Sequence, residues 1–311
     1  MKTLCENWSP VPGVTGCNPA TPPAARSEAP RTLDAGIAYA LSLIRSRYEG
    51  NRDPDNDMPF HSAAHTAGVI RRTGALLGAM GATEKECRVG LLAAAFHDTV
   101  QRWMPHALAD GRILRQRCTG QNEADSAAEA VAWMHHCGGE AFHEQDARVV
   151  TQAILATVPG WDVENETVSQ PNLTPSACAV VRAVALADLG IAGMAAAAFV
   201  ETGDQLFREE NLDIGRALRL AVTGAEPPAG TLEGYKARML AWSRSQASFA
   251  RGRRARLEIE LGNLTSTAKA AVRALFSGFG VSLAAATEAV KAREPLPPWE
   301  VARAMGYTIQ K

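Results

Sequence analysis

Four places in the sequence carry residues that could do chemistry together. His61 and His65 are four positions apart, which on a helix puts both imidazoles on one face, about one turn apart. His97-Asp98 follows the apolar segment LLAAAF, and Asp188 lies in the apolar segment ALADLG. Asn122-Glu123 opens an expected helix after a stretch rich in arginine. Taken alone, each has an ordinary explanation, such as a solvated helix face or an acid that complements the helix dipole.

The combination of these residues predicts a metal site. His97, Asp98 and Asp188 all have Leu, Ala, Val or Phe as neighbours in the sequence. Burying charged carboxylates among such residues is costly unless a cation compensates them. Imidazole nitrogens together with carboxylate oxygens form a ligand set that suits Mn, Fe, Co, Ni or Zn. The sequence therefore predicts a divalent transition metal near these residues.

The elements that must position these residues are expected to be helices. Thr83 and Glu86 form a capping box, and the apolar segment that follows predicts a central, buried helix. No strand pattern stands out, so the predicted class is all-α. Helices are expected over about 33–48, 60–80, 84–99, 123–137, 144–157, 175–189 and 232–261, with shorter ones in 265–311.

Composition bounds the domain organisation and the class of protein. The 311 residues are 46% hydrophobic, which allows one or two domains with a sizeable core. Residues 1–30, rich in Pro, Ala and Ser, are expected to form a flexible leader. Residues 31–262 are expected to form the metal-binding helical domain, and residues 263–311 a helical extension.

Charge, apolar runs and cysteines indicate where the protein acts. The 32 Lys and Arg nearly balance the 33 Asp and Glu, which argues against nucleic acid as a partner. The longest apolar stretches are far shorter than the roughly 20 residues of a membrane helix, so no membrane is expected. The six cysteines include no C-x-x-C pair and are expected to be reduced thiols, which predicts a cytoplasmic protein.

The order H…HD…D on predicted helices resembles the HD-domain superfamily of metal-dependent phosphohydrolases. FHSAAHTAGV resembles the family pattern YHNxxHxxxV, and LLAAAFHD resembles its AALFHD. NEADSAAEAV, ALADLG and FARGRRARLEIEL resemble segments of bacterial members of predicted phosphohydrolase type. The resemblance covers about residues 33–262 and implies a helical bundle with the metal between its central helices.

The resemblance also implies roles for individual residues. It implies that His65, His97, Asp98 and Asp188 bind the metal. His61 matches the histidine that acts as general acid in the cyclic-nucleotide phosphodiesterase branch, although Phe60 and Ser62 stand where that branch has Tyr and Asn.

Departures from the family pattern predict one metal rather than two. Many members have HDxGH or HDxGK, whereas this chain has His97-Asp98-Thr99-Val100-Gln101. Related proteins often carry a further His after an ILAT segment, and here Val158-Pro159 follows it. His135-His136 could supply ligands, but beside Gly138-Gly139 at a helix end they are expected at the surface.

The leading expectation is hydrolysis of a phosphoester in a nucleotide or another small phosphorylated substrate, by a metal-activated water. Asp98 would ligate the metal and orient that water, while His61 or Glu123 would carry a proton. Guanidinium groups could clamp the phosphate, and the candidates are Arg102, Arg112, Arg115 and Arg117.

Two alternatives stay open at the level of sequence. One is a di-iron oxygenase on the same scaffold, which needs about six protein ligands where four are clear. The other is a non-catalytic regulatory domain that binds a metal or nucleotide, with the basic run 251–256 or the C-terminal extension serving a partner or a homodimer.

Overall fold

The computed structural model describes residues 32–50, 53–138, 141–222, 227 and 229–308. The leader expected over residues 1–30 lies outside these described residues. The described residues are mostly helical, with 68% of them in helices and 6% in strands. In chain order the helices are α1 (Leu33–Tyr48), η1 (Pro54–Asn56), α2 (Ala63–Met80), α3 (Glu84–Phe96), α4 (Gln121–Cys137), α5 (Glu144–Leu155), α6 (Ala179–Asp188), α7 (Ile191–Met194), η2 (Ala196–Ala198), α8 (Phe199–Glu210), α9 (Leu212–Val222), α10 (Ala229–Glu260), α11 (Ser266–Leu275), α12 (Phe279–Arg293) and α13 (Pro298–Ala304).

Helix α3 is the centre of the fold, as its apolar sequence predicts. It contacts α1, α2, α4, α5 and α6, and the five residues from Leu92 to Phe96 are all completely buried. The predicted capping box at its start is present, because the Thr83 hydroxyl accepts from the backbone N–H of Glu86 while the Glu86 carboxylate accepts from that of Thr83. Helix α1 packs closely on α3 at Gly36, where a Cβ would lie 2.7 Å from Leu92.

Three helices begin elsewhere than the sequence suggested. Helix α2 begins at Ala63 with Ser62 as its N-cap, so Phe60 and His61 precede it. Helix α4 begins at Gln121 after Gly120, whose φ of 85° suits a residue without a side chain, so Asn122 is not the cap. Helix α6 begins at Ala179 and not near residue 175, because residues 175–176 form a turn.

Two antiparallel hairpins correct the expectation that the chain contains no strands. The first pairs β1 (Trp103–Ala107) with β2 (Ile113–Arg117), and the second pairs β3 (Gly160–Asp162) with β4 (Thr167–Ser169). In the first hairpin Trp103 faces Arg117 and Pro105 faces Arg115. The arginine-rich stretch that precedes Asn122 is therefore an ordered hairpin.

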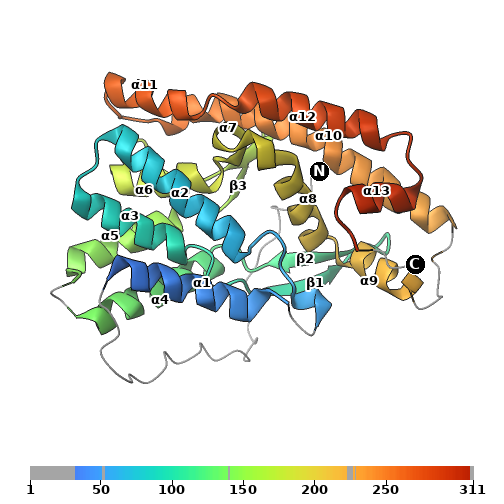
Figure 1. Ribbon diagram of the computed structural model, residues 1–311, viewed down its shortest axis with the longest axis horizontal. Coiled ribbons are helices and arrows are strands. Elements are labelled where there is room, and N and C mark those ends of the chain that lie inside the picture. The colour runs from blue at the N-terminus through green and yellow to red at the C-terminus, as the bar shows by residue number, and fades with distance from the viewer. Residues whose placement is uncertain (1–31, 51–52, 139–140, 223–226, 228, 309–311) are drawn as a thin grey trace.

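The C-terminal helices pack on the rest of the protein. Figure 1 shows α11 and α12 along the upper edge of the molecule, where α12 packs beside the long α10. Helix α11 contacts α2, and Val272, Phe276 and Phe279 belong to the same apolar cluster as α3. A second apolar cluster joins α8, α9, α10 and α13.

Helices α11 and α12 together contain the one described stretch that is long and apolar enough to cross a membrane. The stretch is Ser266–Arg293, with a mean hydropathy of 1.4 and 28% of the tested window buried. By length and composition it exceeds the apolar runs considered in the sequence, although core helices of soluble proteins pass the same test. Residues 276–278 interrupt it with a turn.

Candidate metal centre

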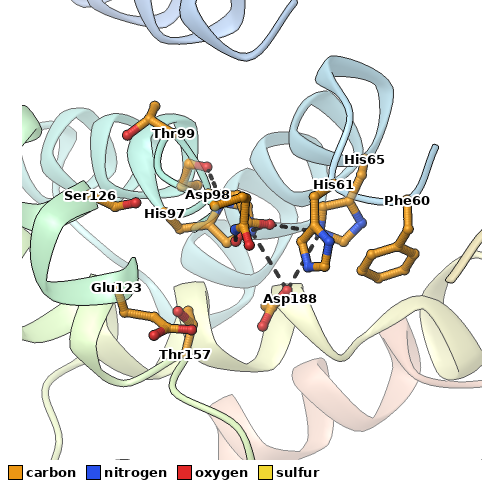
Figure 2. A network of polar contacts seen from close by, with 12 residues as sticks. Phe60, His61, His65, His97, Asp98, Thr99, Glu123, Ser126, Thr157 and Asp188 are labelled. Atoms are coloured by element: carbon orange, nitrogen blue, oxygen red, sulfur yellow. Dashed lines mark hydrogen bonds and ion pairs between the residues drawn. The ribbon is translucent and has the colours of Figure 1, made fainter. Parts of the chain in front are cut away.

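Three helix ends bring two imidazoles and two carboxylates together (Figure 2). His65 lies in the first turn of α2, His97-Asp98 follows the last turn of α3, and Asp188 is the last residue of α6. The Nε2 of His97 is 2.9 Å from Oδ2 of Asp98, and the Nε2 of His65 is 3.5 Å from the same oxygen. Both nitrogens are 3.6 Å from Oδ1 of Asp188. The four residues that the sequence nominated as ligands therefore form one cluster.

The Nε2 atoms of His65 and His97 lack, among the described residues, the hydrogen bonds that buried nitrogens usually make. The Nδ1–H of His97 donates to the carbonyl of Ala94 at 2.8 Å, so in the neutral ring the lone pair is on Nε2. Neither that Nε2 nor the Nε2 of His65 has a hydrogen-bond partner among the described residues, although Oδ2 of Asp98 lies near both. Two buried nitrogens without partners are what a metal site requires.

The separations between the two imidazole nitrogens and the carboxylate oxygens also suit a single ion, with Asp188 lying beside the group of His65, His97 and Asp98. Metal bonds of about 2.1 Å to nitrogen and oxygen place neighbouring ligand atoms roughly 3.0–3.4 Å apart. The measured separations of 2.9–3.6 Å lie at or near that range. His65, His97 and Asp98 also form a group of side chains that could hold a metal ion, and the side chains of the two imidazoles are 5% and 1% exposed. The residues present therefore fit a divalent cation.

The electrostatics of the cluster favour added positive charge. Burial opposes ionisation of Asp98 and Asp188, but the neighbouring imidazoles outweigh it and hold the pKa of both carboxyls below the ordinary value. Burial disfavours charge on His97 too, yet the two carboxylates raise its pKa to about 10, whereas burial dominates at His65 and lowers its pKa. Both carboxylates lie at helix C-termini, where the helix dipole is unfavourable for an anion.

Side chains from three other places hold the carboxylates in position. The amide Nε2 of Gln101 donates to Oδ1 of Asp98 at 2.8 Å, and the Nε2 of Gln170 donates to Oδ2 of Asp188 at 3.3 Å. The Nε–H of Arg72 donates at 2.7 Å to the carbonyl of Ala187, directly before Asp188. Such outer partners orient metal ligands and tune their basicity.

His61 lies beside the cluster, but not for the reason that its spacing suggested. It precedes α2 rather than lying one helical turn before His65, and the two ring centres are 6.2 Å apart. Its Nδ1 forms a short contact with Oε1 of Glu209, whose Oε2 accepts from the backbone N–H groups of Phe60 and His61 at 3.1 Å. Because Glu209 holds Nδ1, the remaining ring nitrogen is available for proton transfer.

Glu209 and Glu210 are the acidic residues of this region that sequence reasoning missed. Burial opposes ionisation of Glu209, but His61 and Arg115 outweigh it and hold its pKa at about 2. Burial and the charge of Glu209 raise the pKa of Glu210 to about 7. The only local signal is the pair of acids at the end of α8, because their partner His61 lies 148 residues away from Glu209.

Glu123 serves as a helix cap in this structure. It is 3% exposed, and its Oε2 accepts from the backbone N–H of Gly120 at 2.5 Å, at the start of α4. The contacts of its carboxylate that can be described are this bond and Nη2 of Arg117 at 4.0 Å. Its proposed role in proton transfer stays a prediction. His135 lies at the surface as expected, with 66% of its side chain exposed.

The hairpin separates the candidate phosphate-binding arginines into two pairs. Arg102 and Arg112 form surface ion pairs with Asp125 and Asp110. In contrast, Arg115 is 5% exposed and lies 4.4 Å from the centre of the Trp103 ring. The Nη2 of Arg115 donates to the carbonyls of Asp55 and Asp57, while its Nε and Nη1 are buried without a hydrogen-bond partner among the described residues. Arg117 donates from Nε to Oε1 of Gln101 at 2.9 Å.

A comparison of the chain with models of protein families, with curated proteins and with solved structures found no match. The identification of the candidate metal centre therefore depends on the geometry of its residues.

Proposed function

We propose that this protein is a metal-dependent phosphohydrolase of the HD-domain type, acting on a nucleotide or another small phosphorylated metabolite. The observation that carries the proposal is that two imidazole nitrogens, which lack a hydrogen-bond partner in the described part of the chain, converge on the carboxylates of Asp98 and Asp188. Imidazole and carboxylate together are the ligands of hydrolytic metal centres built from Mn, Fe, Co, Ni or Zn.

The ligands would be His65, His97, Asp98 and Asp188. When bound, a divalent metal supplies Lewis-acid chemistry that polarises a phosphoryl oxygen and makes a water acidic enough to attack at neutral pH. Four protein ligands leave room for water and substrate at an ion that accepts five or six ligands. Asp188 is the ligand most open to solvent, with 16% of its side chain exposed.

Side chains of the protein, His61 first among them, would transfer the proton. His61 has Nδ1 engaged by Glu209, so its Nε2 would donate a proton to the leaving oxygen. Arg115 has a buried Nε and Nη1 without hydrogen-bond partners among the described residues, so its guanidinium keeps donors that could bind a phosphate oxygen. The charge of Arg115 acts on Glu209, the carboxylate that holds His61, so it lies on the proton-donor side of the centre.

The test is metal content together with turnover. Protein purified without chelator should contain one transition metal per chain by elemental analysis and should hydrolyse some members of a panel of phosphomonoesters, phosphodiesters and nucleotides. Asp188→Asn should lower both metal content and turnover. Asp162→Asn is the matched control, because Asp162 accepts hydrogen bonds from the β3–β4 turn and from Arg256.

Each rival function gives a different result in the same experiment. A di-iron oxygenase would contain two irons per chain and consume oxygen, whereas a non-catalytic domain would bind metal or nucleotide without turnover. Metal content unchanged by Asp188→Asn would count against the proposed ligand set.

A further inference from the structure

The contacts around Asp98 bear on how many metal ions the centre can hold. In two-metal sites the ions are about 3.5–4 Å apart and stabilise both the attacking and the leaving oxygen. A carboxylate that bridges two ions uses both of its oxygens. In this protein Oδ2 of Asp98 faces the imidazoles of His65 and His97, so bridging would require Oδ1.

Oδ1 of Asp98 is already occupied. The Nε2 of Gln101 donates to it at 2.8 Å, and Gln101 is 5% exposed, so water cannot readily replace this bond. The amide is fixed in this orientation because its Oε1 accepts from Nε of Arg117 at 2.9 Å. Turning the amide over would set its oxygen against the Asp98 carboxylate and its NH2 group against the guanidinium.

Arg117 links Gln101 to Glu123. Its guanidinium lies between the Gln101 amide and the buried carboxylate of Glu123, whose Oε1 is 4.0 Å from Nη2. The Arg117 side chain is only 16% exposed, at the end of β2 four residues before α4 begins. A guanidinium is always charged in proteins, so this position already holds a fixed cation.

We propose that Gln101 and Arg117 make the centre mononuclear: Gln101 takes the oxygen of Asp98 that a bridge would need, and Arg117 takes the place of a second cation beside Glu123. This inference rests on the proposed metal-dependent function. In this arrangement the fixed charge of Arg117 neutralises Glu123. Gln101 is a positioning residue that holds Asp98. The pair His135-His136 is exposed, and Nε2 of His135 lies 4.0 Å from Glu144 at the surface.

Manganese binding to the full-length protein tests the proposal. Equilibrium dialysis with Mn2+ counts the ions per chain, and electron paramagnetic resonance distinguishes an isolated ion from a coupled pair. The wild-type protein and the control Arg102→Ala should bind one ion, since Arg102 pairs with Asp125 at the surface. The double variant Gln101→Glu with Arg117→Ala, which adds a carboxylate and removes the cation, should bind two ions that are spin-coupled.

Two results would overturn the proposal while leaving the proposed function intact. One is two ions per chain in the wild type, and the other is a folded double variant that still binds one. No ion bound by the wild type would instead overturn the proposed function and this inference with it. If circular dichroism shows that the double variant is unfolded, the milder double variant Gln101→Glu with Arg117→Gln carries the test, because it also removes the cation: two ions support the proposal, and one ion rejects it.

Discussion

His61 and His65 show how neighbouring histidines take different roles. His65 is fixed in the first turn of α2, and its Nε2 has no hydrogen-bond partner among the described residues. His61 lies before that helix, and its Nδ1 is held by Glu209. A nitrogen without a partner suits a ligand, whereas a nitrogen held by a carboxylate orients the ring for proton transfer. The two roles can be separated by substitution.

His61→Ala should keep the metal and lose turnover. A general acid typically contributes about 10² to 10⁴ in rate, and the loss should be greatest for substrates with poor leaving groups. An aryl phosphate needs little proton donation and should suffer less. Steady-state rates on the two kinds of substrate, with metal content measured on the same samples, check this. The control is His106→Ala on the exposed face of β1. Loss of metal from His61→Ala would make His61 a ligand.

The buried carboxylate of Glu209 makes the free energy of unfolding depend on pH. Its pKa is about 2 in the folded protein and 4.5 ordinarily, so its contribution is complete above pH 4.5 and is lost as the pH falls toward 2. That difference corresponds to about 3 kcal/mol for a fully buried group. Glu209→Gln should lower the free energy of unfolding by up to that amount at pH 6, and the gap to the wild type should narrow by pH 3.

Urea titrations of both proteins at pH 6, 5, 4 and 3 measure the gap. Glu201→Gln, on the same helix and exposed, is the control and should change little at any pH. A gap that stays constant from pH 6 to pH 3 would show that the Glu209 carboxylate is not held ionised by its partners.

At the scale of elements, the site is built where α2 starts and where α3 and α6 end. The helices themselves could be predicted, because Thr83 and Glu86 cap α3 and its buried face is continuous. The first hairpin could not, since Pro105 within a strand usually argues against one, although Asp110-Gly111 is a turn signal. Pairing with the distant Asn211 and packing of Arg115 on Trp103 help to hold it.

The candidate ligands could be predicted from sequence, but most of their supports could not. His97, Asp98 and Asp188 stand out because charged residues are rare in apolar helices. Glu209, Gln170 and Arg72 have no such signal, because they meet their partners only through the tertiary fold.

Helix α2 positions the end of α6 through Arg72. Its Nε–H donates to the carbonyl of Ala187, which fixes the backbone that presents Asp188. Arg72→Lys keeps the positive charge but loses the planar geometry of this bond, so metal affinity should fall about 10-fold or more. Competition of Mn2+ with a fluorescent chelator measures the change. Arg71→Lys, exposed on the same helix, is the control, and equal affinities in the two variants would contradict the role.

At the scale of the whole molecule, the C-terminal helices are part of the fold that supports the site. The backbone N–H of Gly278 donates to the carbonyl of Gly193 at 2.8 Å, and the Ser282 hydroxyl donates to that of Ala192 at 2.7 Å. Both carbonyls belong to α7, which begins three residues after Asp188. Residues 263–311 therefore contact the segment that directly follows a candidate ligand.

Phe276 offers the sharpest test of this arrangement. It is 5% exposed and lies in the same apolar cluster as α3. Its ring packs closely on Gly193, because a Cβ added at Gly193 would lie 2.4 Å from Cδ1 of Phe276. Phe276→Ala should lower the free energy of unfolding by about 3–5 kcal/mol. Val281→Ala should change it by less than about 0.5 kcal/mol, because Val281 is 62% exposed.

Removal of residues 263–311 should have a larger effect than either substitution. A domain is stable by only about 5–15 kcal/mol, and the deletion removes Val272, Phe276 and Phe279 and uncovers the faces of α2 and α7 against which α11 and α12 pack. The truncated chain should therefore be unfolded or aggregated at 25 °C, as judged by circular dichroism and size-exclusion chromatography. It should bind Mn2+ more weakly than the full chain. A truncated protein that stays folded and binds the metal normally would mean that the metal-binding domain ends at residue 262 and that α11–α13 only cover it.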